Sequence, residues 1–89
     1  MTLRIQRSTN GDVVVFSLSG RIEGEQAEQL HDLFASEPGD HRIVVDLEEV
    51  DLVDRDAVRF LARCAADGIV LESCPAYIRE WIGRERHGE

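Results

Sequence analysis

Charged residues cluster between an apolar segment and the amphipathic segment that follows it. The run Ile43–Leu47 has the composition of a buried strand, and apolar residues then recur at helical spacing from Asp54 to about Asp67. In α/β proteins, functional groups commonly lie on the exposed rim where the carboxyl end of a strand leads into a helix. Four charged residues occupy this predicted rim: Asp51, Asp54, Arg55 and Asp56.

Three arginines, Arg55, Arg59 and Arg63, recur every four residues and form a stripe opposite the apolar side of this predicted helix. The planar guanidinium suits such a stripe to docking on an acidic partner surface. The alternative is a solvated helix face, in which the arginines pair with acidic residues three or four positions away, Asp56 and Asp67. The sequence leaves both interpretations open.

Other chemistries lack the spacing that they require. The acidic residues between positions 46 and 56 do not follow the ligand pattern or the glycine turn of a calcium loop, and no phosphate-binding glycine motif occurs. Cys64 and Cys74 form neither a disulfide framework nor a metal-ligand pair. Cys74 precedes Pro75 at an expected helix start, so it is either an activated thiol or a structural one. We expect no metal, no cofactor and no catalytic residue.

Hydrophobic patterning predicts the elements that position this junction. Alternation predicts strands at 3–7 and 12–19, joined by an Asn-Gly turn, with Gly20 ending the second strand. Two further apolar runs predict strands at 43–47 and 69–71. Apolar spacing and stop signals predict helices at 25–36, at 54–67 and from Pro75 to about Gly83.

The resulting order is β-β-α-β-α-β-α, which is an α/β fold with a mixed four-stranded sheet and right-handed crossovers. The helices are expected mainly on one face of the sheet. Val13, Val15 and Val44 then lie near the less covered face. That face is either shielded by the last helix or used for association, including formation of a homodimer.

Length and charge limit the function classes. The chain of 89 residues predicts a single domain over 1–89, ordered from about 3 to 83, with a frayed tail at 84–89. A net charge of -8 argues against nucleic-acid binding and favours a protein partner. No apolar run reaches the roughly 18 residues of a membrane span, and no signal peptide is evident, so a cytoplasmic protein is expected.

Two stretches resemble the STAS family, which includes domains of sulphate transporters and anti-sigma factor antagonists. The stretch 15–23 is similar to the family's strand ending in Gly-x-Leu-Asp. The stretch 44–54 is similar to its apolar strand and to the Asp that opens its second helix. The resemblance covers nearly the whole chain and implies a SpoIIAA-like fold.

In the switchable members of that family, Asp-Ser-Ser-Gly or Asp-Ser-Thr-Gly opens the second helix, and a partner kinase phosphorylates the first Ser. The aligned residues here are Asp54, Arg55, Asp56 and Ala57. Arg55 therefore occupies the phosphoacceptor position, which implies that this chain has lost the switch. Asp56 instead places a permanent negative charge near the helix N-terminus, where anions are favoured.

The resemblance implies a non-enzymatic interaction module that is similar to anti-sigma factor antagonists. Its expected partner is an anti-sigma factor or serine kinase-type regulator, bound through the N-terminal part of the second helix. The expected partner-binding residues are Asp54, Arg55, Asp56, Arg59 and Arg63. The alternative is a cytoplasmic accessory subunit of a lipid ABC transporter in the membrane, because stand-alone STAS domains also occur there.

Overall fold

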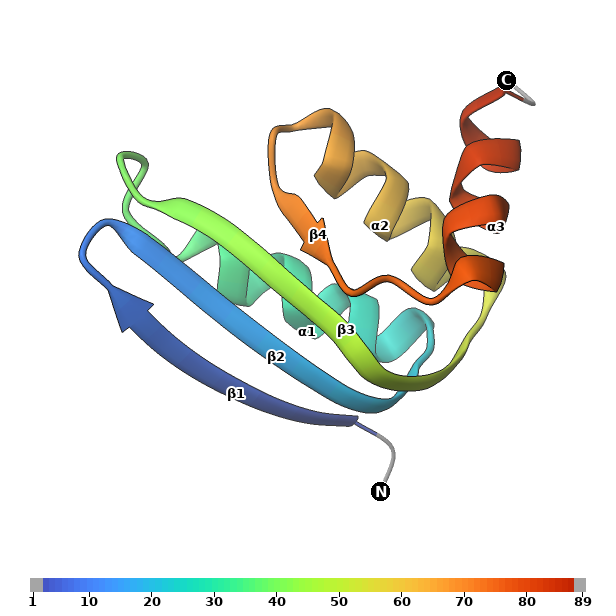
Figure 1. The fold of residues 1–89 in the computed structure, drawn as a ribbon, viewed down its shortest axis with the longest axis horizontal. Coiled ribbons are helices and arrows are strands. Elements are labelled where there is room, and N and C mark those ends of the chain that lie inside the picture. Colours follow the sequence, from blue (N-terminus) through green and yellow to red (C-terminus); the bar gives the residue numbers. More distant parts are fainter. Residues whose placement is uncertain (1–2, 88–89) are drawn as a thin grey trace.

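The computed structural model describes residues 3–87, and the side chains of residues 3–85. Its elements alternate as the sequence predicts, in the order β-β-α-β-α-β-α (Figure 1). They are β1 (Leu3–Asn10), β2 (Val13–Ile22), α1 (Gly24–Ala35), β3 (Arg42–Val53), α2 (Arg55–Ala66), β4 (Val70–Glu72) and α3 (Ala76–His87).

The four strands form one mixed sheet in the order β1-β2-β3-β4. The β1–β2 pair is antiparallel and turns at Gly11, whose φ of 65° a glycine adopts without steric cost. The β2–β3 and β3–β4 pairs are parallel, so α1 and α2 are crossover helices. The parallel arrangement brings the carboxyl ends of β2 and β3 to the same end of the sheet, where α1 and α2 both begin.

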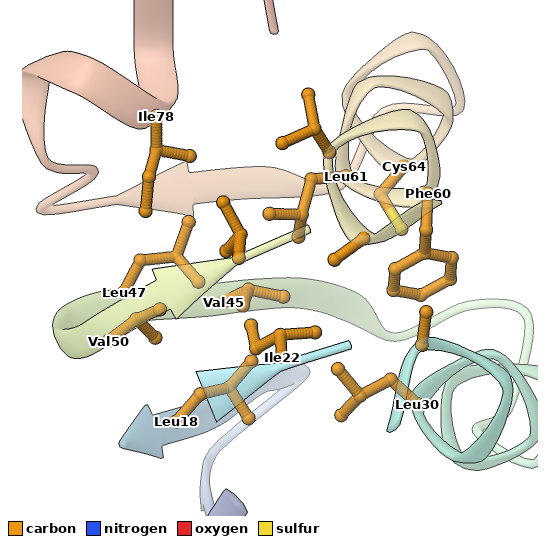
Figure 2. Close-up of a cluster of buried hydrophobic side chains, with 14 of the residues drawn as sticks. Leu18, Ile22, Leu30, Val45, Leu47, Val50, Phe60, Leu61, Cys64 and Ile78 are labelled. Carbon is orange, nitrogen blue, oxygen red and sulfur yellow. The ribbon is translucent and has the colours of Figure 1, made fainter. Parts of the chain in front are cut away.

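One core fills the space between the sheet and the helices (Figure 2). The alternating residues Val14, Phe16 and Leu18 of β2 are buried there, as their period-2 pattern predicts. Leu61 of α2 and Ile78 of α3 are fully buried and face the sheet in the same cluster. All three helices therefore pack on one face, and each fully buried aliphatic side chain stabilises the fold by about 1.5 to 3 kcal/mol.

Both central strands extend further than the patterning predicts. Gly20 does not end β2 but lies inside it with φ 98°, and β3 continues through the acidic segment to Val53. The β2–β3 register shifts between Ser17 and Ser19 and again between Gly20 and Arg21, which gives β3 one extra residue at each shift. Such bulges bend a strand and increase its twist, and they interrupt the alternation from which strands are predicted.

The last helix also extends beyond its predicted end. α3 continues through Gly83 to His87, so residues 84–87, which the sequence assigns to the tail, belong to a helix. Residues 88–89 lie outside the described part of the chain. A glycine inside a helix costs only about 1 kcal/mol relative to alanine, which contacts on either side can offset.

Candidate functional site

Asp54 joins the N-termini of α1 and α2. It is the N-cap of α2, where Oδ1 accepts a hydrogen bond from the backbone N–H of Ala57 at 2.8 Å. Oδ2 accepts a second hydrogen bond from the backbone N–H of Gly24, the first residue of α1, at 3.1 Å. One carboxylate thus satisfies a donor in the first turn of two helices, where negative charge is favoured. Asp54 is half-buried in this role.

Arg55 and Arg59 converge on Glu85, which lies on α3. The Nε atoms of Arg55 and Arg59 lie 3.5 Å and 3.3 Å from its carboxylate oxygens. Arg59 therefore pairs with a residue of another helix, and not with an acidic residue of α2 as the solvated-face interpretation supposed. Sequence reasoning missed Glu85 because it lies in the segment that was expected to fray.

Glu85 is held as a carboxylate by its neighbours. Burial opposes its charge, but the Arg59 hydrogen bond, the charges of Arg55 and Arg59, and a hydrogen bond from the Trp81 indole together hold its pKa below the ordinary value. Its side chain is only 19% exposed. Glu85 therefore attaches the C-terminal half of α3 to the first turns of α2.

A second contact attaches the other end of α3. The Tyr77 hydroxyl donates a hydrogen bond to the backbone carbonyl of Asp51 at 2.8 Å. β4 pairs with β3 only as far as Asp46, so Asp51 belongs to a stretch of β3 beyond the β4 ladder. Tyr77 thus satisfies a carbonyl at an open strand edge, which limits pairing with other chains. The Tyr77 side chain remains exposed, whereas Trp81 packs against the core.

An open groove of about 440 Å³ lies between α1 and α2, and we call it the α1–α2 groove. Three of the predicted partner-binding residues line it, namely Asp56, Arg59 and Arg63. Its other lining residues are Gly24, Ala27, Glu28, His31 and Phe60. Asp56 and Arg63 are exposed and form no hydrogen bond or ion pair within the described part of the chain.

The five predicted site residues thus fall into two groups. Asp54 is a helix cap, and Arg55 lies outside the α1–α2 groove, paired with Glu85. Asp56, Arg59 and Arg63 share the groove. Only the last group combines surface exposure with a concave setting, an arrangement that favours binding of another molecule.

The two cysteines lie outside this arrangement. Burial, together with the charge of Asp67, raises the pKa of the Cys64 thiol to about 12. Burial also raises the pKa of the Cys74 thiol, although the charge of Arg79 opposes the shift. Both shifts reduce the thiolate fraction, so of the two interpretations of Cys74 the structural thiol is favoured over the activated one.

The fold and this junction define a class of small α/β domain, with a mixed sheet covered on one face by helices. A profile of the family described as "Mlab, STAS domain" matches residues 5–75, and the chain belongs to the STAS family. The match includes the β3–α2 junction and ends before α3. A comparison with curated protein sequences gave no significant match.

Solved structures show the same fold. One is Mglu, with 31% identity and a TM-score of 0.60 over 80% of this chain; the chain spans only 19% of the length of that protein. A second is an antisigma-factor antagonist STAS domain from Rhodobacter sphaeroides, with 14% identity and a TM-score of 0.55, covering 83% of this chain and 97% of that one.

A third is an uncharacterised protein with a SpoIIAA-like fold from Shewanella loihica, with 17% identity and a TM-score of 0.58. It covers 98% of this chain and 78% of that one, so the likeness includes nearly all of the chain. The SpoIIAA-like fold expected from the sequence is thereby confirmed. None of the described helices has the length and apolar character needed to cross a membrane.

Proposed function

We propose that this domain is a non-enzymatic interaction module, similar to anti-sigma factor antagonists, that binds a regulatory protein in the α1–α2 groove. The observation that supports this most directly is the convergence of Asp56, Arg59 and Arg63 on one open groove beside the N-terminus of α2. Membership of the STAS family supports a role in protein–protein interaction. The Rhodobacter sphaeroides domain is described as an antisigma-factor antagonist, which is consistent with that role.

The proposed surface is constitutive and is not switched by phosphate. Arg55 is the first residue of α2 and occupies the position of the family's phosphoacceptor, and residues 50–60 contain no Ser, Thr or Tyr. The anion that a phosphate would bring to this helix N-terminus is replaced by carboxylates: Asp54 accepts from the first turn, and Asp56 is exposed beside it. The charge at the site is therefore fixed.

A fixed surface also supports the second candidate, an accessory subunit of a membrane transporter. A permanent subunit needs an interface that does not change charge, so the lack of a phosphoacceptor is compatible with both functions. The two candidates differ in the partner that they bind, and identification of that partner separates them.

The test is affinity capture from the source cell with the tagged domain, followed by mass spectrometry of the retained proteins. The groove variants are Asp56→Lys and Arg63→Glu, which change exposed residues without described partners. Asp40→Lys is the matched control, because Asp40 is exposed in the α1–β3 loop at the opposite end of the sheet. Arg59→Glu is unsuitable because it would place a second carboxylate beside Glu85.

We expect the unchanged domain and Asp40→Lys to retain an anti-sigma factor or serine kinase-type regulator. Both groove variants should retain at least tenfold less of this partner. Retention of transporter subunits with the same dependence on the groove would instead establish the second candidate. Equal retention by all four baits would contradict a binding site in the groove. With a captured kinase and ATP, only an Arg55→Ser variant should accept phosphate within residues 50–60.

A further inference from the structure

The face of the sheet opposite the helices carries a row of valines. In the register of the sheet, Val15 of β2 lies beside Val44 of β3, and Val44 lies beside Val70 of β4. Their neighbours along the strands, Phe16 and Val45, are buried in the core, so the valines point to the other face. We call this surface the valine face.

No helix within residues 3–87 covers the valine face. In Figure 1 α1 lies behind β2 and β3, and no helix crosses in front of the sheet. α3 does not shield this face, because Ile78 and Ile82 belong to the core on the helical side. Val70 is 41% exposed and Val15 is half-buried, whereas Val44 between them is only 7% exposed. An apolar row on a sheet face that no helix covers is a feature of interaction surfaces.

Charged residues of opposite sign border the row. On one side, two residues before Val44, lies Arg42, which is exposed. On the other side, two residues after Val44, lies Asp46, whose neighbour on β4 is Glu72. Two residues along a strand correspond to about 6.6 Å. The valine face therefore has a positive border and a negative border at similar distances from its apolar centre.

We propose that two copies of this chain associate face to face through the valine face, related by a two-fold axis that follows the row from Val15 to Val70. Rotation about this axis places the valines of one copy over those of the other and reverses the strand direction. Arg42 of each copy then lies over Asp46 of the other, with Glu72 alongside. Sheets packed in this way lie about 10 Å apart, a separation that valine and arginine side chains bridge.

A second copy is the occupant that the charge pattern favours. A two-fold interface must be complementary to itself, and opposite charges on the two sides of an apolar row satisfy that condition. Nucleic acid and anionic membrane surfaces are disfavoured by the net charge of -8. The dimer leaves the α1–α2 groove free, because the groove lies on the helical side. The inference is therefore independent of the proposed function.

Sedimentation velocity over a range of protein concentrations tests this dimer. We expect concentration-dependent dimers that weaken with added salt, because Arg42 and Glu72 are exposed and Asp46 is only half-buried. Val70→Asp and Arg42→Glu should each weaken association at least tenfold. Arg79→Glu is the matched control, since it makes the same charge change at an exposed position on α3 and should leave association unchanged.

A charge exchange provides the decisive comparison. Asp46→Arg should weaken association by bringing like charges together, and Arg42→Glu combined with Asp46→Arg should restore it. Asp46 also accepts a hydrogen bond from the backbone N–H of Glu48 at 2.9 Å, and both variants carrying Asp46→Arg lose that bond. Thermal melts verify that each variant is folded. A monomeric unchanged domain at all concentrations, or failure of the exchange to restore the dimer, would overturn the proposal.

Discussion

The two carboxylate oxygens of Asp54 serve different helices. The resemblance to the STAS family places this residue in the partner-binding set, whereas its hydrogen bonds are made to the backbones of α1 and α2. A residue that closes two helix N-termini contributes to stability whether or not a partner is bound. Its neighbour Asp56 has no such bonds and is exposed to solvent in the groove.

Replacement of Asp54 by alanine should therefore destabilise the domain by about 1 to 2 kcal/mol, the usual effect of losing a helix N-cap. Urea denaturation followed by circular dichroism measures this change. Asp56→Ala is the control and should cost less than about 0.5 kcal/mol, because it removes an exposed side chain without a described partner. Equal destabilisation by the two variants would show that Asp54 does not act as a structural cap.

At the scale of elements, α3 is attached to the junction at two points. Glu85 contacts Arg55 and Arg59 of α2, and Tyr77 contacts the backbone of Asp51 in β3. Between them, Trp81 packs against the core. α3 therefore limits how much of the β3–α2 junction remains open to a partner.

The lowered pKa of Glu85 makes this attachment sensitive to acid. Its stabilising contribution is fully present above the ordinary value of 4.5 and is lost as the pH falls through the lower pKa of the folded state. The contribution of Glu37 to stability depends on pH in the same direction, because its hydrogen bonds with Arg7 lower its pKa. The domain should thus lose stability below about pH 4.5.

Trp81 fluorescence reports the attachment of α3. In the unchanged domain, the emission should shift to longer wavelength as the pH falls below 4.5. Glu85→Gln removes the charge at every pH, so its emission should already be shifted at pH 7 and change less with acid. Glu80→Gln, an exposed glutamate on the same helix, is the control and should behave as the unchanged domain does. Identical titrations of all three proteins would contradict this role of Glu85.

At the scale of the whole molecule, stability depends on one core that sheet and helices share. Phe34 packs against both Phe16 of β2 and Phe60 of α2, with ring centroids 4.9 Å and 5.9 Å apart, and so connects three elements. Leu61 is fully buried in the same cluster. A domain of this size has little stability in reserve, since native domains are stable by only about 5 to 15 kcal/mol.

Leu61→Ala should cost about 2 to 5 kcal/mol, because it removes buried methyl groups and leaves a cavity between α2 and the sheet. Chemical denaturation measures the change in the free energy of unfolding. Leu33→Ala makes the same substitution on α1, where the Leu33 residue is 39% exposed, and should lower the free energy of unfolding far less. A comparable loss in both variants would argue against a specifically packed core.

The order of the elements and the core faces of β2 and α2 follow from the sequence alone. The alternation of Val14, Phe16 and Leu18 and the helical spacing of Phe60, Leu61 and Cys64 indicate which side chains are buried, and all six are. These patterns are local, because the geometry of one strand or one helix fixes which residues share a face. The two stretches that resemble the STAS family can also be recognised from the sequence without knowledge of the fold.

The construction of the junction depends instead on contacts between residues far apart in the sequence. The bonds of Asp54 to Gly24 and of Tyr77 to Asp51 join residues 30 and 26 positions apart, and Arg59 pairs with Glu85 across 26 positions. No local period encodes such contacts, since they depend on how the sheet brings α1, α2 and α3 together. The bulges in β3 were hidden for the related reason that they interrupt the alternation by which a strand is recognised.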